Sequence, residues 1–191
     1  MLTNRYYPFN NQKERQPCRK VSLKSEREVA MQKDNLIFRR TDDRNDFNSC
    51  ALMMSGTDPW ITLGIGYDLC LTALEGSFRE VHIVTEDGKI AGFAILQLSG
   101  SFSGYIQTLC VSEEYRGRGI GSALLTYCEE QILKISPNIF ICVSSFNTRA
   151  RKLYESFGFK LVGELDNFIK EGFSEFLFRK TVGPRIGYHA H

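Results

Sequence analysis

The residues with the clearest chemical meaning lie between Tyr105 and Ser122, where a strand-like apolar run ends at Val111 and a glycine-rich turn follows. The turn and the residue after it are Arg116, Gly117, Arg118, Gly119, Ile120, Gly121 and Ser122. Glycines let main-chain N–H groups approach an anion closely, and the positive end of a following helix dipole adds to the attraction. The segment therefore predicts a phosphate-binding turn between a strand and a helix.

Two common phosphate-binding motifs do not fit this turn. The dinucleotide fingerprint needs a third glycine where this chain has Ser122, and the nucleotide triphosphate loop needs a Gly-Lys-Ser or Gly-Lys-Thr that occurs nowhere in the chain. What remains is an R-x-x-G-x-G pattern after a Leu-Cys-Val strand end. A tight basic turn with a purely structural role is the alternative, because glycine-rich turns are common.

A second motif follows about 25 residues later. The apolar run Ile139–Ser144 is typical of a buried strand, and Asn147 is a favourable N-cap for a short helix after it. One face of that helix is apolar, with Ala150, Leu153, Tyr154 and Phe157 at positions i, i+3, i+4 and i+7. Gly158 suits the left-handed position just past the helix end.

The two motifs together, in this order and spacing, resemble those of the GNAT superfamily of acetyl-CoA-dependent N-acetyltransferases. The resemblance extends from about Asp42 to Lys180. It implies an α/β (α+β) fold, with a central mixed, mostly antiparallel sheet flanked by helices in the order βααβββαβαββ. It also implies an acetyltransferase that moves an acetyl group from acetyl-CoA, its cosubstrate, to a primary amine by direct attack.

In that superfamily a bulge in the strand before the glycine turn splays it from the next strand, and the acyl-pantetheine enters the gap. The corresponding strand here is Tyr105–Val111. The resemblance implies that main-chain groups of Leu109, Cys110 and Val111 bind the pantetheine and polarise the acetyl carbonyl, whose developing oxyanion needs an N–H donor.

The resemblance assigns the remaining site residues as well. Amides of Gly117–Ser122 would bind the diphosphate, and Arg116 and Arg118 would add positive charge. Asn147 would form a hydrogen bond to the pantetheine arm. Tyr154 would protonate the departing thiolate, since a phenol with a pKa near 10 is protonated at neutral pH.

The general base and the acceptor stay open. The Asp58-Pro59-Trp60 segment is similar to that of bacterial ribosomal-protein alanine N-acetyltransferases, but their strand glutamate is Cys142 here, which we interpret as a packed thiol. Carboxylates that could serve instead are Glu80, Glu113, Glu114 and Asp166. The acceptor is a small-molecule amine or a protein N-terminal α-amine, contacted by the early helices, Trp60 and residues 167–172.

The elements that must position these residues follow from the apolar periodicity. Helices are expected over Asp42–Met54 and Leu63–Leu74, and Asp87-Gly88 predicts a hairpin turn between two strands. Late strands are expected over Phe159–Leu165 and Ser174–Thr181. We expect residues 1–32 to form a flexible extension, residues 33–182 the acetyltransferase domain and residues 183–191 a loose tail. A separate hypothesis is that Met31 is the native start.

Composition restricts the partners. A net charge of +2 gives no reason to expect nucleic acid or an anionic membrane, and no apolar run is long enough to cross a bilayer. Six cysteines without a C-x-x-C pair indicate reduced thiols in a cytoplasmic protein and no metal site. A homodimer is an expectation from the superfamily alone. A non-catalytic acyl-CoA-binding regulatory domain and a protein-interaction module are the alternative functions.

Overall fold

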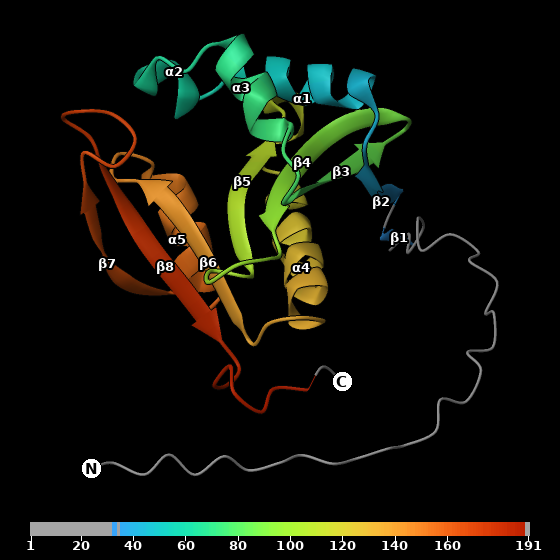
Figure 1. The fold of residues 1–191 in the computed structure, drawn as a ribbon. Helices are drawn as coiled ribbons and strands as arrows, with labels where there is room; N and C mark the ends of the chain where they lie inside the picture. The colour runs from blue at the N-terminus through green and yellow to red at the C-terminus, as the bar shows by residue number, and fades with distance from the viewer. Residues whose placement is uncertain (1–31, 34, 190–191) are drawn as a thin grey trace, which may run out of the picture.

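The computed structural model describes residues 32–33 and 35–189, and Figure 1 shows its helices packed on both faces of one sheet. The strands are β1 Gln32–Lys33, β2 Leu36–Thr41, β3 Arg79–Glu86, β4 Lys89–Gln97, β5 Tyr105–Val111, β6 Asn138–Ser144, β7 Lys160–Asp166 and β8 Ser174–Thr181. The helices are α1 Arg44–Ser55, α2 Trp60–Leu63, α3 Tyr67–Leu74, α4 Ile120–Leu133 and α5 Thr148–Ser156, with a 3-10 turn η1 over Glu113–Tyr115.

The described residues form an eight-stranded sheet in the order β1-β2-β3-β4-β5-β6-β8-β7. Every neighbouring pair is antiparallel except β5 and β6, which are parallel. This mixed, mostly antiparallel sheet confirms the predicted fold class. The expected extension lies outside the described residues except for Gln32, as does Met31.

Two apolar cores cover the two faces of the sheet. Alternate residues of β4 supply both, since Phe93 and Ile95 pack under α1 and α3 while Ala94 and Leu96 pack under α4. The core under α4 and α5 also contains residues of β6 and β8, including Ile141 and Phe178. We call these two sides of the sheet the α4–α5 face and the α1–α3 face.

Local sequence signals were accurate at most turns and wrong at one helix. Asp87 and Gly88 both have positive φ and close the predicted β3–β4 hairpin. The single helix expected over Leu63–Leu74 is instead two helices, because Gly64 adopts a left-handed conformation with φ of 72° and ends α2.

A bulge in β5 separates it from β6. Leu96 pairs with Ile106 and Ile95 pairs with Thr108, so Gln107 is the extra residue on β5. β5 and β6 then pair at only two positions, Tyr105 with Phe140 and Ile106 with Ile141. Beyond those pairs the two strands diverge, as Figure 1 shows, and the expected splay is present.

Gly104 directly precedes β5, at the end of the strand where β5 and β6 still pair. Its φ is 94°, and an added Cβ would lie 2.3 Å from the Asn138 carbonyl oxygen. Gly104→Ala should therefore lower the free energy of unfolding by about 3 kcal/mol or more, measured by urea denaturation. Gly163→Ala on β7 is the control, because its Cβ would contact nothing within 4 Å. Equal stabilities for the two variants would contradict this assignment.

Within the described residues, no helix is both long and apolar enough to cross a membrane. The cysteines in that part of the chain are free thiols: Cys50, Cys70, Cys110 and Cys128 are buried and Cys142 is partly buried. Cys18 lies outside the described residues. No cluster of His, Cys, Asp and Glu side chains able to hold a metal ion occurs in the part of the chain that the structure describes.

Candidate active site

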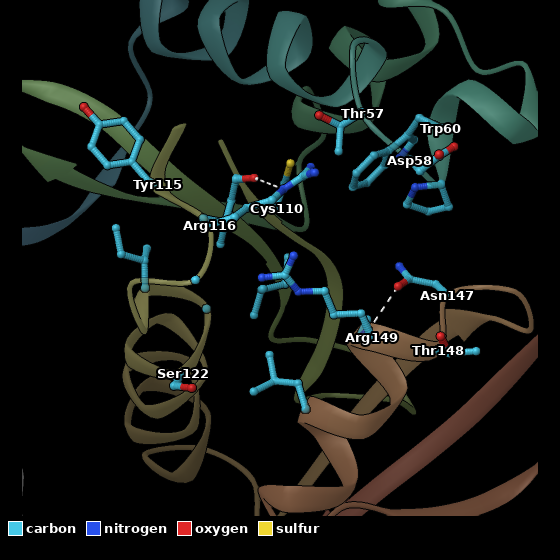
Figure 2. Close-up of a pocket in the computed structure, with 18 of the residues that line it drawn as sticks. Thr57, Asp58, Trp60, Cys110, Tyr115, Arg116, Ser122, Asn147, Thr148 and Arg149 are labelled. Atoms are coloured by element: carbon cyan, nitrogen blue, oxygen red, sulfur yellow. Dashed lines mark hydrogen bonds between the residues drawn. The ribbon is translucent and has the colours of Figure 1, made fainter. Parts of the chain in front are cut away.

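A pocket of about 530 Å³ lies where β5 and β6 diverge and where α4 and α5 begin. Figure 2 shows its walls, which come from the end of β5, the glycine turn, the start of α5 and the segment before α2. The wall contains ten of the residues that the sequence assigned to cofactor binding: Leu109, Cys110, Val111, Arg116, Gly117, Gly119, Ile120, Gly121, Ser122 and Asn147. Residues far apart in the sequence are thus brought to one cavity.

The glycine turn exposes main-chain amides at the N-terminus of α4. Gly117 and Gly119 have φ of 80° and 81°, the left-handed conformation that side chains rarely adopt. A Cβ added at either position would contact nothing within 4 Å, so the space beside the turn is open. The first amides of the 14-residue α4 therefore point their unpaired N–H groups and the positive end of the helix dipole toward that space.

The two arginines of the turn differ in direction. Arg116 lines the pocket, and its Nε donates a hydrogen bond to the Val111 carbonyl at 3.3 Å. Arg118 is not part of the pocket wall. Its guanidinium pairs with Glu86 at 2.8 Å and lies over the Tyr115 ring. The structure thus places one of the two predicted charges at the pocket and directs the other to β3.

This difference predicts unequal effects on cosubstrate affinity. Arg116→Ala should raise the Kd for acetyl-CoA about tenfold, because a charge-assisted hydrogen bond contributes about 1.5–3 kcal/mol. Arg118→Ala should change that Kd less than threefold, because the Arg118 guanidinium is paired with Glu86. Isothermal titration calorimetry on both variants measures this, and equal losses would contradict the assignment.

The start of α5 forms the opposite wall. Asn147 is the N-cap, and its Oδ1 accepts a hydrogen bond from the Ala150 amide at 3.1 Å, as predicted. Arg149 also lines the pocket, and Figure 2 shows its side chain extending into the space between α4 and α5. Sequence reasoning did not single out Arg149, since an arginine on a short helix is typical of a solvated face.

Tyr154 lies behind the wall and does not line it. Its side chain is 5% exposed and packs against Phe159 in the core, while the preceding residue, Leu153, faces the pocket. Burial raises the pKa of the Tyr154 phenol, and a smaller contribution comes from Cys110, which is in the pocket wall. The phenol is therefore fully protonated at neutral pH, and it follows Leu153 of the pocket wall in the chain.

The elements expected to contact an acceptor lie together on the α1–α3 face. Trp60 lines the pocket. The Lys170 ammonium, in the β7–β8 loop, donates to the Thr62 carbonyl of α2 at 3.3 Å. The Phe173 ring of that loop contacts Phe146, another pocket residue, with centroids 5.6 Å apart. The loop and α2 therefore border the same side of the pocket.

The carboxylates proposed as bases from the sequence lie elsewhere. Glu113 and Glu114 are exposed on η1, and Asp166 is exposed and accepts from the Ser174 hydroxyl. Glu80 lies on β3, paired with Arg40 at 3.0 Å, and its hydrogen bond to His82 lowers the pKa of its carboxyl. None of the four lines the pocket.

One buried carboxylate was missed by the sequence reasoning. Glu175 of β8 is 3% exposed and accepts a hydrogen bond from the Ser144 hydroxyl at 2.5 Å. A charged residue directly before the apolar run Phe176–Phe178 was the available signal. Burial raises the pKa of the neighbouring Cys142 thiol, which agrees with its interpretation as a packed thiol.

Comparison with known proteins decides the family. The sequence profile described as the Acetyltransferase (GNAT) family matches residues 50–159, more than half of the chain. The chain belongs to the GNAT family of acetyltransferases. The matched region contains the glycine turn and Asn147, and it ends at Phe159.

Two curated proteins with similar sequences are N-alpha-acetyltransferases. N-alpha-acetyltransferase 40 of Saccharomyces cerevisiae is 34% identical over 92 residues, 44% of this chain and 32% of that protein. An N-alpha-acetyltransferase of Sulfurisphaera tokodaii is 27% identical over 104 residues, 48% of this chain and 62% of that protein. The matches thus span about a third of the first relative and less than two thirds of the second.

Solved structures of other proteins share the fold at low sequence identity. The ribosomal-protein-S18-alanine N-acetyltransferase of Escherichia coli has a TM-score of 0.62 and 18% identity, covering 80% of this chain and 97% of that one. A GNAT acetyltransferase of Elizabethkingia anophelis with acetyl-CoA bound has a TM-score of 0.59 and 18% identity, covering 78% and 100%. Arabidopsis thaliana NAA60, in complex with a bisubstrate analogue, has a TM-score of 0.60 and 20% identity, covering 76% and 97%.

Proposed function

We propose that this protein transfers an acetyl group from acetyl-CoA to the free α-amine of a peptide or protein N-terminus. The observation that carries the proposal is the pocket itself, which has the amides of a glycine turn at one end and the separated strands β5 and β6 beside it. Those features fit the two ends of an acyl-CoA, a diphosphate that needs N–H donors and an acyl-pantetheine that needs unpaired strand backbone.

In this reaction the amides of residues 117–122 and Arg116 hold the diphosphate, and Asn147 binds the pantetheine arm. Main-chain groups of β5 beyond Gln107 are free of β6 and polarise the acetyl carbonyl. Tyr154 donates the proton that the departing thiolate takes up. The raised pKa of its phenol keeps that proton available across the neutral range.

The surface beside the pocket favours a peptide over a polycationic metabolite. Exposed apolar side chains border the acceptor side: Ile61, Phe146, Phe168 and Ile169. Among the described residues that line the pocket, Asp58 is the only carboxylate, and it accepts hydrogen bonds from the Thr62 amide and hydroxyl. Polyamines and aminoglycosides are instead expected to need several free carboxylates. The curated relatives, both N-alpha-acetyltransferases, support the same acceptor.

An α-amine also suits a site whose pocket wall has no free carboxylate. Its pKa near 8 leaves part of it neutral at physiological pH, whereas a lysine amine with a pKa near 10.4 is almost entirely protonated. An enzyme that acetylates an α-amine therefore has to deprotonate a smaller fraction of its acceptor than one that acetylates lysine.

The test measures CoA-thiol release from acetyl-CoA with a panel of peptides that have free N-termini, each paired with the same peptide N-terminally formylated. We expect release with the free peptides, none with the blocked ones, and a +42 Da product on the α-amine by mass spectrometry. Polyamines, aminoglycosides and lysine peptides complete the panel. Transfer only to those amines would overturn the acceptor, and binding without any transfer would indicate a regulatory acyl-CoA-binding domain.

A further inference from the structure

The end of β6 and the start of β8 form a buried polar cluster on the α1–α3 face of the sheet. Ser144 pairs with Glu175 and Cys142 pairs with Leu177, and residues paired across antiparallel strands point to the same face. Tyr105 pairs with Phe140, two residues before Cys142, so it shares that face as well. Residues on the opposite face of β6, such as Ile141, belong to the core under α4 and α5.

This cluster borders the gap between β5 and β6. β6 ends at Ser144, and two residues later Phe146 and Asn147 are already part of the pocket wall. On the other side of the gap, β5 is unpaired with β6 after Ile106. Glu175 does not itself line the pocket; its carboxylate is buried at the strand ends that lead to the pocket wall, on the same face of the sheet as the α1–α3 core.

The groups around Glu175 leave its negative charge without a cation. The titratable side chains that interact with it are Tyr105 of β5, Cys142 of β6 and Tyr154 of α5, and burial raises the pKa of each, so all three are neutral near pH 7. β7 contributes Leu165 opposite Glu175. Within the described residues no ion pair involves Glu175, and its carboxylate accepts a hydrogen bond from the Ser144 hydroxyl.

We infer that Glu175 is the general base of the reaction, accepting the proton of the amine as it attacks the acetyl carbonyl. The inference rests on the proposed function. A carboxylate that is buried beside a cavity and has no cationic partner is a stronger proton acceptor than an exposed or paired one. It also differs from the four carboxylates considered from the sequence, which are exposed or ion-paired, because Glu175 is buried and has no ion pair among the described residues.

The proton balance closes between Glu175 and Tyr154. The nitrogen lone pair forms the C–N bond, the C–S bond breaks, and the sulfur receives the proton of Tyr154. Glu175 takes the proton that leaves nitrogen and returns it to the Tyr154 phenolate; Tyr154 belongs to the core under α4 and α5 and interacts electrostatically with Glu175. The net change is one amide and one thiol from one amine and one thioester, with both side chains restored.

Burial raises the pKa of the Glu175 carboxyl, and the hydrogen bond from Ser144 lowers it in part. The base is active only when ionised, so kcat should fall as the pH drops through that pKa. Ser144→Ala removes the group that favours the charged form, so the acid limb of kcat should move to higher pH. A hydroxyl with a purely structural role would leave the position of that limb unchanged.

The test compares kcat against pH, at saturating peptide and acetyl-CoA, for wild type, Glu175→Gln, Ser144→Ala and Glu164→Gln. Glu175→Gln should lower kcat about 100-fold and remove the acid limb while the Kd for acetyl-CoA stays within threefold, since general bases contribute about 10²–10⁴-fold. Glu164, exposed on β7, is the matched control and should behave as wild type.

The Tm separates loss of a base from loss of the fold. A raised pKa in the folded state means that ionised Glu175 disfavours folding once the pH exceeds the unfolded value. Glu175→Gln should therefore melt at or above the wild-type temperature at pH 8. A Glu175→Gln enzyme with wild-type kcat and acid limb would overturn the base role, as would an unshifted limb in Ser144→Ala. Absence of transfer by wild type would instead overturn the proposed function.

Discussion

Tyr154→Phe is expected to lower kcat by about 100-fold or more while the Kd for acetyl-CoA changes less than twofold. The substitution removes only the hydroxyl, and the ring can keep its contact with Phe159. Without a donor the thiolate must leave unprotonated, and a positioned proton donor contributes about 10²-fold or more. Steady-state rates of thiol release and calorimetric titration of acetyl-CoA give the two quantities separately.

The matched control is Tyr127→Phe. Tyr127 is also a buried phenol on a helix of the same core, but its hydroxyl bonds His82 Nδ1 at 3.0 Å, and it does not line the pocket. Loss of the Tyr127 hydroxyl should lower the free energy of unfolding and leave kcat within twofold of wild type. If Tyr154→Phe and Tyr127→Phe have the same kcat, Tyr154 has only a packing role.

Gly119→Val should raise the Kd for acetyl-CoA at least 100-fold. At φ of 81° a β-branched side chain is strained, so the turn must change its conformation and its amides must move away from the diphosphate. Two lost hydrogen bonds to a charged group, at about 1.5 kcal/mol each, correspond to about 100-fold in affinity. The increase in Tm with added acetyl-CoA should be lost in the same variant.

Gly187→Val controls for backbone strain, because Gly187 has φ of 80° but lies in the C-terminal segment, outside the pocket. It should bind acetyl-CoA as wild type does. A Gly119→Val protein that keeps wild-type affinity would show that the turn does not bind the diphosphate, and the assignment of residues 117–122 would be abandoned.

The parts of the fold that the sequence predicted depend on local interactions. The Asn147 cap, the left-handed Gly158 and the Asp87-Gly88 hairpin each involve neighbours within a few residues, and the structure contains all three. The helix expected over Leu63–Leu74 was wrong for a local reason too. Its apolar spacing continued through Gly64, and periodicity does not report the backbone conformation at which a glycine ends a helix.

Details of the site were harder to predict because their causes are distant in the sequence. The ion pair that draws Arg118 away from the pocket joins it to Glu86, 32 residues earlier. Glu175 and Ser144 are 31 residues apart and meet only because β8 pairs with β6. A motif identifies which residue types are present, whereas the direction of each side chain is set by strand pairing that no short motif contains.

The most direct measurement of the central claim follows the backbone amide resonances of residues 117–122 by NMR while acetyl-CoA is added, and then repeats the titration with acetyl-pantetheine. Acetyl-pantetheine has the thioester and the arm but no diphosphate. The account predicts large shifts at these amides with acetyl-CoA and small ones with acetyl-pantetheine, while Leu109–Val111 respond to both. Equal shifts at 117–122 with the two compounds, or none with acetyl-CoA, would contradict it.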